Sequence, residues 1–496
     1  MTESVDVAIV GSGFSGLGAA INLKREGRDD FVVLERAEEV GGTWWANTYP
    51  GCACDVPSHL YSFSFALNPD WSEAYPKQPE IRDYLIRCSN EYGVRPHIRF
   101  GTDVTDARWD EDRQRWAIAT GAGDYDARVL VVATGQLFEP RIPDFPGIDE
   151  FEGETWHSAR WNHDYDLAGK KVVSIGTGAS AIQLIPEIQP QVDHLTVVQR
   201  TPPWVLPQAN RVTTRFERTV FRRVPALQRL LRGAVYTVLE TFVLGFVKNP
   251  RVMGLPERLA KRHIAGQLGD RADLVERVTP DYALGCKRML LSNKWYPALA
   301  QDNVDLVTAP IKEFTRRSVV FEDGTEVEAD AVVFSTGFRV SEIPSSRLVR
   351  DAQGRTLHDV WNGSARAHRG TAVAGFPNMF MLLGPNTGLG HSSMVYMAES
   401  QIAYLMDALR TMDREGATAV ELRAEAQKAY NDRVQKKLEG TVWNTGCASW
   451  YMDEQGRNVT LWPDFTFVFR RQTEHFDAGA YELQPLREQG REAVTA

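Results

Sequence analysis

The sequence predicts an α/β protein with two Rossmann-like dinucleotide-binding domains and a helical insertion in the second. A short apolar run, Val5 to Val10, leads directly into a glycine-rich turn, Gly11 to Gly16, and then into a helical pattern. The same order of elements returns at Lys171 to Ile175 and at Gly176 to Ala181. Strand, glycine turn, helix and strand form the βαβ unit that binds dinucleotides, so its repetition predicts two such domains.

The composition is that of an ordinary globular protein of about two to four domains. Of the 496 residues, 43% are hydrophobic and 24% are charged, which excludes global disorder. The net charge of −9 gives no reason to expect nucleic acid as the main partner. Five cysteines provide no disulfide framework, and the first residues lack the basic start of a secretory signal. We therefore expect a cytoplasmic protein without a stable membrane insertion.

The first glycine turn meets the requirements of a dinucleotide site. Gly11, Gly13 and Gly16 occupy the glycine positions of the G-x-G-x-x-G pattern, and Ser15 lies between them. Glycines there allow a tight turn and let a pyrophosphate approach the amides at the helix N-terminus. Glu35 closes the next strand, where a carboxylate suits the free 2′-hydroxyl of a ribose. This half is predicted to bind an unphosphorylated adenosine, as in FAD or NAD.

The second turn differs at two positions. Ala181 replaces the third glycine, which the pattern tolerates because a methyl group still fits between helix and strand. Arg200 lies 24 positions after Gly176, the same offset that separates Gly11 from Glu35. A guanidinium suits a 2′-phosphate through charge-assisted hydrogen bonds, so this half is predicted to bind NADP. The alternative is that Arg200 is a solvated surface arginine that binds no phosphate.

Two similar motifs mark where the chain is expected to cross between the domains. The apolar strand 129–132 ends in Ala133-Thr134-Gly135, and strand 331–334 ends in Ser335-Thr336-Gly337. With two dinucleotides in one chain, a hydride donor in one domain can pass two electrons to a flavin in the other. The expected division is 1–140 for the first part of the FAD-binding domain, 141–210 and 286–340 for the NADP-binding domain, 211–285 for the helical insertion, and 341–496 for the second part of the FAD-binding domain with a C-terminal segment.

The insertion has a helical pattern between Arg215 and Leu274. Its apolar residues recur at i, i+3 and i+4 spacing, as Leu227, Leu230, Leu231, Ala234, Val238 and Phe242 show. We expect these helices to pack on the NADP-binding domain, and a helix on a membrane surface is the alternative. The apolar stretch 233–247 is interrupted by Glu240 and is too short to span a bilayer.

Three further stretches carry longer motifs. Residues 151–161 read F-x-G-x-x-x-H-x-x-x-W, and residues 41–55 read G-G-T-W, then Y-P-G, then Asp55. Residues 285–288 read G-C-K-R. Together with both glycine turns, these stretches resemble the type I Baeyer–Villiger monooxygenases, class B flavoprotein monooxygenases, over nearly the whole chain. Asn162 departs from the Pro or Asp that usually follows Trp161, which weakens the subfamily assignment more than the activity.

The resemblance implies an enzyme that uses FAD, NADPH and molecular oxygen on a small-molecule ketone. NADPH reduces FAD, the reduced FAD captures oxygen as a C4a-peroxide, and this attacks the ketone to give an ester or lactone. Arg288 matches the catalytic arginine, and Asp55 matches the carboxylate that orients it by a bidentate pair. A guanidinium favours the peroxyanion and cannot give up a proton at neutral pH. His157 has either a structural role in domain movement or a direct role in the chemistry.

The resemblance also implies the cofactor contacts, residue by residue. The FAD contacts are Gly42, Thr43, Trp44, Asp55, Tyr61, Val104 and Met394, in addition to Glu35 and the first turn. The NADP contacts are Thr177, Gly178, Ala179, Ser180, Ala181, Ile182, Gln183, Arg200, Thr201 and Lys287, and Trp450 matches a residue that closes over NADP.

Three other functions are alternatives to this one. A related flavin monooxygenase that oxidises nitrogen or sulfur in soft nucleophiles tends to carry Tyr or Phe where this chain has Trp161. A disulfide reductase would need a C-x-x-C dithiol, and a non-catalytic redox-sensing flavoprotein would not need an NADP site. Cys52, Cys54 and His59 lack a fourth ligand, so no metal site is predicted. No particular ketone and no oligomeric state are predicted.

Overall fold

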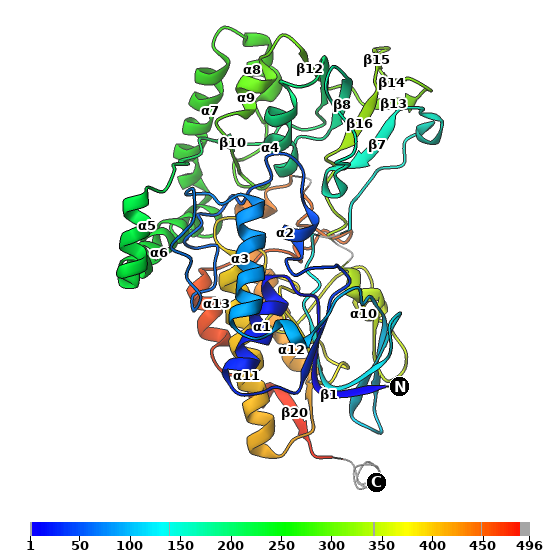
Figure 1. Cartoon of the computed structure of the whole chain (residues 1–496), viewed down its shortest axis with the longest axis vertical. Coiled ribbons are helices and arrows are strands. Elements are labelled where there is room, and N and C mark those ends of the chain that lie inside the picture. Colours follow the sequence, from blue (N-terminus) through cyan, green and yellow to red (C-terminus); the bar gives the residue numbers. More distant parts are fainter. Residues whose placement is uncertain (1, 138, 341–342, 448, 487–496) are drawn as a thin grey trace.

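The computed structural model describes residues 2–137, 139–340, 343–447 and 449–486, and it has two lobes stacked along the long axis (Figure 1). The lower lobe contains the first and last strands, β1 (Glu3–Val10) and β20 (Tyr481–Gln484), and is built on the sheet that includes β1. The upper lobe is built on the sheet that includes β8 (Lys171–Ile175). One hydrophobic cluster runs through both lobes, with Val7 and Val172 among its members.

The lower sheet has eight strands in the order β17-β4-β5-β6-β1-β2-β3, and β18 also pairs with β6. Strands β18, β6, β1, β2 and β3 run parallel, which leaves β5 as the antiparallel strand between β4 and β6. This parallel half contains the first predicted βαβ unit. The other strands are β2 (Phe31–Leu34), β3 (Ile98–Arg99), β4 (Val104–Asp110), β5 (Arg115–Thr120), β6 (Tyr125–Val132), β17 (Val349–Arg350) and β18 (Met379–Met381).

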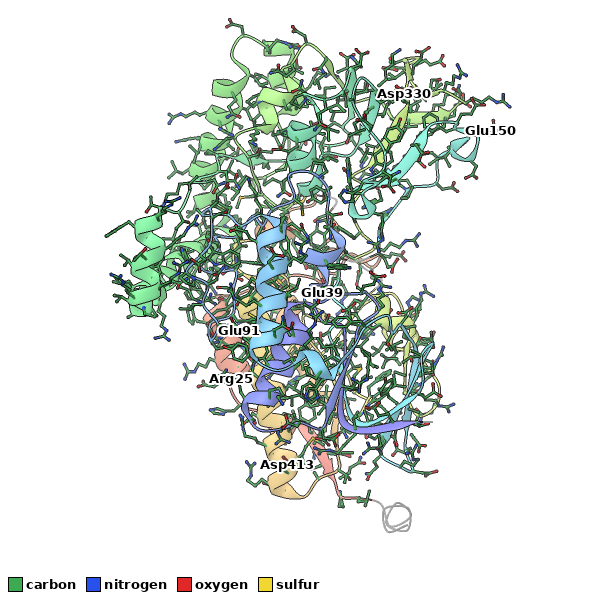
Figure 2. The ribbon with its side chains drawn as sticks, in the orientation of Figure 1. Arg25, Glu39, Glu91, Glu150, Asp330 and Asp413 are labelled. Carbon is green, nitrogen blue, oxygen red and sulfur yellow. A yellow bond between two sulfur atoms is a disulfide. The ribbon has the colours of Figure 1, made fainter. Side chains whose placement is uncertain are left out.

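Long helices cover one face of the lower sheet. Helix α1 (Phe14–Arg25) packs along α11 (Met394–Glu415), and α3 (Gln78–Glu91) and α13 (Thr466–Thr473) flank them (Figure 1). Asp413 near the end of α11 pairs with Arg28 and Arg128, which ties this helix to the turn after α1 and to β6 (Figure 2). The remaining lower-lobe elements are α2 (Thr43–Ala46), α10 (Leu357–Trp361), α12 (Ala424–Leu438), β19 (Ala419–Leu422) and β20 (Tyr481–Gln484).

The upper sheet has five strands, all parallel, in the order β12-β9-β8-β16-β7. It contains the second predicted βαβ unit, β8-α4-β9, so the structure confirms the α/β class and both units. The elements are β7 (Glu154–His157), α4 (Ala179–Ile188), β9 (His194–Val198), α9 (Trp295–Leu299), β12 (Val304–Val307) and β16 (Ala331–Phe334), with a small antiparallel sheet of β13 (Ile311–Phe314), β14 (Ser318–Phe321) and β15 (Glu326–Glu328).

The chain passes from one sheet to the other at the two small-residue motifs. It leaves the lower sheet after β6 and enters the upper sheet at β7, and it returns after β16 to β17. The motifs also pack against the glycine turns. A Cβ atom on Gly11 would lie 2.7 Å from the carbonyl oxygen of Ala133, and one on Gly176 would lie 2.4 Å from that of Ser335. Both turns therefore require glycine at this position. The residue numbers given above for the domain boundaries stay predictions.

The insertion consists of α5 (Arg215–Arg223), α6 (Pro225–Glu240), a π-helical turn (Leu244–Lys248), a 3-10 turn (Pro250–Met253), α7 (Gly254–Leu268) and α8 (Ala272–Val278). Helix α7 contacts α9 and the short pair β10 (Val205–Leu206) and β11 (Leu290–Leu291) of the upper lobe. The expectation that the whole insertion packs on the NADP-binding domain is wrong for α6. Its polar side chains bond the lower lobe instead, where Gln228 donates to the carbonyl oxygen of Asn68 at 2.6 Å.

Within the described residues, one helical stretch, Pro225–Lys248, is long and apolar enough to cross a membrane by length and composition. The expectation that the apolar stretch here is too short is therefore wrong, because the helix begins before residue 233; 22% of its most apolar 18 residues are buried in the protein.

Candidate active site

The first glycine turn and Glu35 form a rigid cradle at the end of β2. The backbone amide and the hydroxyl of Ser12 donate to one carboxylate oxygen of Glu35 at 2.8 and 2.7 Å, and the amide of Ala37 donates to the other at 2.8 Å. A Cβ atom on Gly16 would lie 1.9 Å from the carbonyl oxygen of Gly11, so helix and strand meet here only because this residue is glycine. The carboxylate is thereby held where the fold places an adenosine ribose.

The second glycine turn is open toward solvent where the first is covered. A Cβ atom on Gly178 would meet no atom within 4 Å, whereas the Gly13 position is closed by Gly42 at 3.6 Å. Packing inside the protein therefore does not require glycine at position 178. The open space instead fits a turn whose backbone a pyrophosphate approaches closely. Ala181 is fully buried beneath this turn, as the pattern predicts.

Two cations lie close together beside the second turn. Burial lowers the pKa of Lys287, and the positive charge of Arg200 lowers it further. The Lys287 ammonium lies 4.7 Å from the centre of the Tyr282 ring, and the Thr177 hydroxyl donates to the carbonyl oxygen of Thr201 at 3.2 Å. Two cations that repel each other are stabilised by a shared dianion, so the pair fits the 2′-phosphate of NADP.

The G-G-T-W segment packs on the first turn. The amide of Gly41 donates to the carbonyl oxygen of Ser12 at 3.2 Å, and α2 begins at Thr43. The indole N–H of Trp44 donates to the hydroxyl of Tyr61 at 3.0 Å, and burial raises the pKa of that hydroxyl. The predicted FAD contacts of this segment are thus gathered beside the dinucleotide turn.

The Y-P-G segment joins the two lobes. The hydroxyl of Tyr49 donates to the side-chain oxygen of Gln183 at 2.9 Å, and the side-chain nitrogen of Gln183 donates to the carbonyl oxygen of Ala53 at 3.0 Å. A Cβ atom on Gly51 would lie 2.5 Å from the carbonyl oxygen of Gln183. The amide of Gln183 holds the lower-lobe loop, and the cofactor contact that the resemblance implies for this residue stays a prediction.

Arg288 and Asp55 form an ion pair between segments 233 positions apart. The Nε and Nη2 groups of Arg288 donate to Oδ2 of Asp55 at 3.0 and 2.5 Å. The pair differs from the expected fork, because both donors share one oxygen. The charge of Asp55 raises the pKa of Arg288, so the guanidinium stays charged. Its Nη1 group makes no hydrogen bond to any residue that the structure describes.

A disulfide between Cys286 and Cys447 adjoins this pair. The sequence analysis expected no disulfide framework from five cysteines. Cys52, Cys54 and Cys88 are indeed free, but the expectation is wrong for Cys286 and Cys447. The bridge links the residue before Lys287 to the segment that contains Trp450. The sequence could not pair them, because they are 161 positions apart.

Tyr451 is a site residue that the sequence analysis missed. It is buried, burial raises the pKa of its hydroxyl to about 12, and Arg288 and Asp55 are its charged neighbours. Its ring lies 4.5 Å from that of Trp450, whose side chain is 43% exposed. The only signal in the sequence was its position next to the matched tryptophan.

His157 is buried at the crossing between the lobes. Its Nδ1 atom accepts from the amide of Ala159 at 3.1 Å, and its ring lies 5.8 Å from that of Phe338. Burial lowers its pKa to about 4, so the ring is neutral near pH 7. These contacts favour the structural role over direct chemistry. Among the other predicted contacts, Val104 begins β4 and Met394 begins α11, capped by Ser393.

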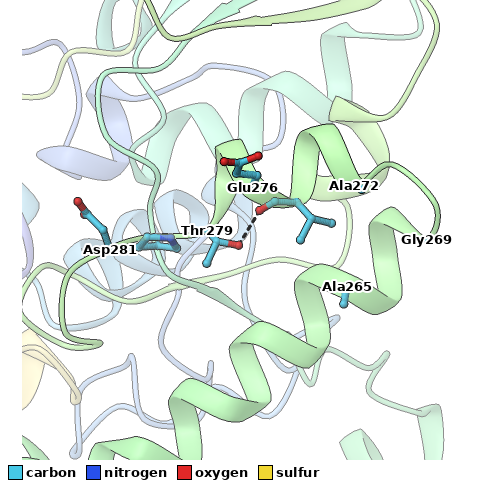
Figure 3. A pocket seen from close by; sticks show the side chains of 8 residues that line it. Ala265, Gly269, Ala272, Glu276, Thr279 and Asp281 are labelled. Carbon is cyan, nitrogen blue, oxygen red and sulfur yellow. Dashed lines mark hydrogen bonds between the residues drawn. The ribbon is translucent and has the colours of Figure 1, made fainter.

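No group of three or more His, Cys, Asp or Glu that could hold a metal ion occurs within the described residues. Burial raises the pKa of the Cys52 thiol to about 12, and the His59 ring contacts the side-chain nitrogen of Gln228 at 3.1 Å. A separate hollow of about 710 Å³ lies in the upper lobe between α7 and α8, where the Thr279 hydroxyl donates to the carbonyl oxygen of Val275 at 2.6 Å (Figure 3). It contains none of the predicted site residues.

The fold and site define a class of protein: an oxidoreductase that binds two dinucleotides, one of them beside a pair of cations that suits a 2′-phosphate. A sequence model described as "FMO-like: Flavin-binding monooxygenase-like" matches residues 4–344. A Baeyer-Villiger monooxygenase from Streptomyces coelicolor is 52% identical over 97% of this chain and 93% of its own length. The chain therefore belongs to the flavin-binding monooxygenase family and, within it, to the Baeyer–Villiger monooxygenases.

Solved structures agree with this assignment. Cyclohexanone monooxygenase from Rhodococcus sp. Phi1, bound to NADP⁺, matches with a TM-score of 0.87 at 29% identity, over 98% of this chain and 100% of that chain. OTEMO in complex with FAD and NADP matches with a TM-score of 0.86 at 26% identity, over 97% of this chain and 100% of that chain. The predicted family, fold class, cofactors and monooxygenase function are confirmed, and the individual site residues stay predictions.

Proposed function

We propose that this chain converts a ketone into an ester or lactone at the Arg288–Asp55 pair, with consumption of one NADPH and one O₂. One oxygen atom of O₂ is inserted between the carbonyl carbon and the adjacent carbon of the ketone. The other oxygen atom leaves as water, whose two hydrogens come from the hydride of NADPH and one proton. The observation that carries the proposal is the guanidinium of Arg288, which a carboxylate holds on one side while Nη1 stays unused by the described residues.

FAD, when bound, supplies the two-electron chemistry that links NADPH to oxygen. The chain's own contribution is electrostatic. A fixed guanidinium stabilises the negative charge that develops next to it, and its high pKa prevents it from quenching that charge with a proton. Asp55 orients the guanidinium, and Tyr451 fills the space beside both groups.

The two nucleotide sites have separate tasks in this proposal. Glu35 and the first turn hold the adenosine end of FAD, and Arg200 with Lys287 selects NADPH by its 2′-phosphate. Tyr49 and Gln183 join the two lobes, and with them the segments that would hold the two cofactors. Dependence on NADPH, a reductant kept inside cells, supports a location in the cytoplasm.

The experiment that tests the function measures three quantities in one reaction: NADPH consumed, ester formed and hydrogen peroxide released. A panel of cyclic, linear, aromatic and steroid ketones is supplied to the FAD-loaded protein. We expect NADPH consumption that depends on the ketone and equals ester formation. Equal turnover with an amine or a thioether, and none with any ketone, would instead identify an oxidase of soft nucleophiles.

A further inference from the structure

Helix α6 exposes its apolar face and buries its polar face. Leu227, Leu230, Ala234 and Val238 are spaced three, four and four residues apart, so they lie on one side of the helix. All four are exposed to solvent, Leu230 to 70% and Val238 to 61%. A helix on the surface of a water-soluble domain shows the opposite arrangement.

The inward side of α6 carries the polar residues. Gln228, Arg232, Tyr236 and Glu240 are spaced four apart on the other side of the helix, where Val235 and Leu239 also contact the core. Arg232 donates to the carbonyl oxygens of His59 and Ser62 at 2.8 and 3.0 Å, and both oxygens of Glu240 accept from Thr466 at 2.8 Å. These bonds fix the orientation of α6, so the apolar face cannot turn inward without leaving buried polar groups unpaired.

The exposed apolar side chains extend over the neighbouring helices. Of the fourteen highly exposed large hydrophobic side chains among the described residues, ten belong to residues 212–259. Helices α5 and α6 project from the left side of the view with α7 above them (Figure 1). We call this the α5–α7 surface, and its apolar members are Val212, Phe216, Val224, Leu227, Leu230, Val238, Leu244, Val252, Leu255 and Leu259.

The same segment is strongly basic. Residues 211–262 contain twelve Arg and Lys and three Glu, a net charge of +9 in a chain whose total is −9. Some of these cations pair with carboxylates, as Arg222 does with Asp70. Six exposed arginines form no salt bridge with any described residue, namely Arg215, Arg223, Arg229, Arg251, Arg258 and Arg262.

We propose that the α5–α7 surface docks this protein on an anionic lipid bilayer. Apolar side chains enter the interface and the unpaired arginines meet the headgroup phosphates, which is the composition that holds amphipathic helices at a membrane surface. Docking by a second copy is disfavoured, because an isologous contact would place +9 against +9. Helix α6 lies along the surface and does not cross it, because Arg232 and Glu240 anchor its other side to the lower lobe.

The test is sedimentation of the full-length FAD-loaded protein with vesicles. Phosphatidylglycerol mixed with phosphatidylcholine is compared with phosphatidylcholine alone, at low and high salt. We expect binding only to the anionic vesicles, weakened by salt. The double variants Phe216→Gln/Leu230→Gln and Arg223→Glu/Arg229→Glu should each lose about tenfold or more in vesicle affinity. This readout is independent of ketone oxidation, so failure of one proposal leaves the other standing.

Matched controls lie on the other side of the upper lobe or between the lobes. Ile142→Gln removes a hydrophobic side chain that is 44% exposed, and Arg317→Glu reverses an exposed charge before β14. Both should bind vesicles as the parent does, and flavin absorbance and melting temperature should show that all variants fold. Equal binding by the surface variants, or none by the parent, overturns the proposal. So does a parent dimer in lipid-free buffer that Phe216→Gln/Leu230→Gln converts to monomer, since that result assigns the surface to a second copy.

Discussion

The hydroxyl of Tyr49 in the lower lobe donates to the side-chain oxygen of Gln183 on α4 of the upper lobe at 2.9 Å. The same oxygen accepts from the amide of Ala53 at 3.2 Å, and the side-chain nitrogen of Gln183 returns a bond to the Ala53 carbonyl oxygen at 3.0 Å. One glutamine thus satisfies three polar groups of the loop that ends at Asp55. The position of the Arg288 partner is therefore tied to the contact between the lobes.

Removal of this glutamine side chain should loosen the contact. Gln183→Ala leaves the Tyr49 hydroxyl and both polar groups of Ala53 without their partner, so we expect a loss of about 1–3 kcal/mol in the free energy of unfolding. Urea denaturation followed by flavin fluorescence measures it. Gln191→Ala, at an exposed position after α4, is the control and should change little. An unchanged midpoint for Gln183→Ala would show that water replaces these bonds.

The nucleotide sites were predictable from the sequence because the residues that form each site are close together in the chain. Gly11, Gly176 and the 24-residue offsets to Glu35 and Arg200 lie within single βαβ units, where a strand, a turn and a helix fix the geometry. Long-range pairs were not predictable in this way. Nothing near Cys286 in sequence indicates Cys447, 161 positions away.

The orientation of α6 was also beyond the sequence. The 3.6-residue period correctly predicted a helix, but periodicity alone does not say which side faces water. The usual assumption that the apolar side is buried failed, because Arg232 and Gln228 find buried carbonyl oxygens in the segment 59–68. Such partners exist only once the lower lobe has folded.

The preference for NADPH over NADH should depend on Arg200. The loss of a charge-assisted phosphate contact in Arg200→Ala costs ~1.5–3 kcal/mol, about 10- to 150-fold in binding. The Michaelis constants for NADPH and NADH are measured for parent and variant. In Arg200→Ala the constant for NADPH should rise, and the constant for NADH should not. Lys312→Ala, on β13 of the same lobe, is the control. A preference for NADPH that survives in Arg200→Ala would refute the offset argument.

Stability should fall as pH falls from about 6.5 to about 4, because burial lowers the pKa of His59 and His157 to about 4. In the unfolded chain these rings take up protons below about pH 6.5, whereas in the folded protein they stay neutral down to about pH 4. Protons therefore favour the unfolded state in this window, by up to about 1.4 kcal/mol per pH unit for each ring.

Urea denaturation at several pH values checks this expectation. His157→Gln removes one of the two titrating rings, so the free energy of unfolding should depend less steeply on pH between about 6.5 and 4. The same change at His475, which is 81% exposed, is the control. A slope that is identical in parent and His157→Gln would exclude His157 as a contributor.

The Cys286–Cys447 disulfide should stabilise the segment around Lys287 and Trp450. A bridge across 161 positions restricts the unfolded chain, and its removal costs ~2–5 kcal/mol in typical proteins. A reductant should therefore lower the melting temperature of the parent and leave that of Cys286→Ala/Cys447→Ala unchanged. Mass spectrometry of the unreduced protein after proteolysis should find the linked peptides. Cys88→Ala controls for the loss of a thiol outside this pair.

The last prediction concerns Arg288. Arg288→Ala should still bind FAD, because Glu35 and the first glycine turn hold the adenosine and pyrophosphate elsewhere. Flavin reduction by NADPH should slow, since the reduced flavin is anionic and the fixed positive charge beside it is gone. Oxygen should then be released as hydrogen peroxide, so that NADPH is consumed without ester.

Steady-state NADPH consumption alone would mislead, because the uncoupled reaction that releases hydrogen peroxide also uses NADPH. The stopped-flow absorbance of the flavin is therefore recorded together with product analysis. Arg288→Lys keeps the charge but not both donors to Asp55, and should lie between parent and Arg288→Ala in ester yield. Tyr451→Phe keeps the charged pair and the packing, and controls for disturbance of the site. An Arg288→Ala protein that forms ester at the parental rate would remove this residue from the reaction, whereas the two nucleotide sites would stand, because they rest on Glu35 and Arg200.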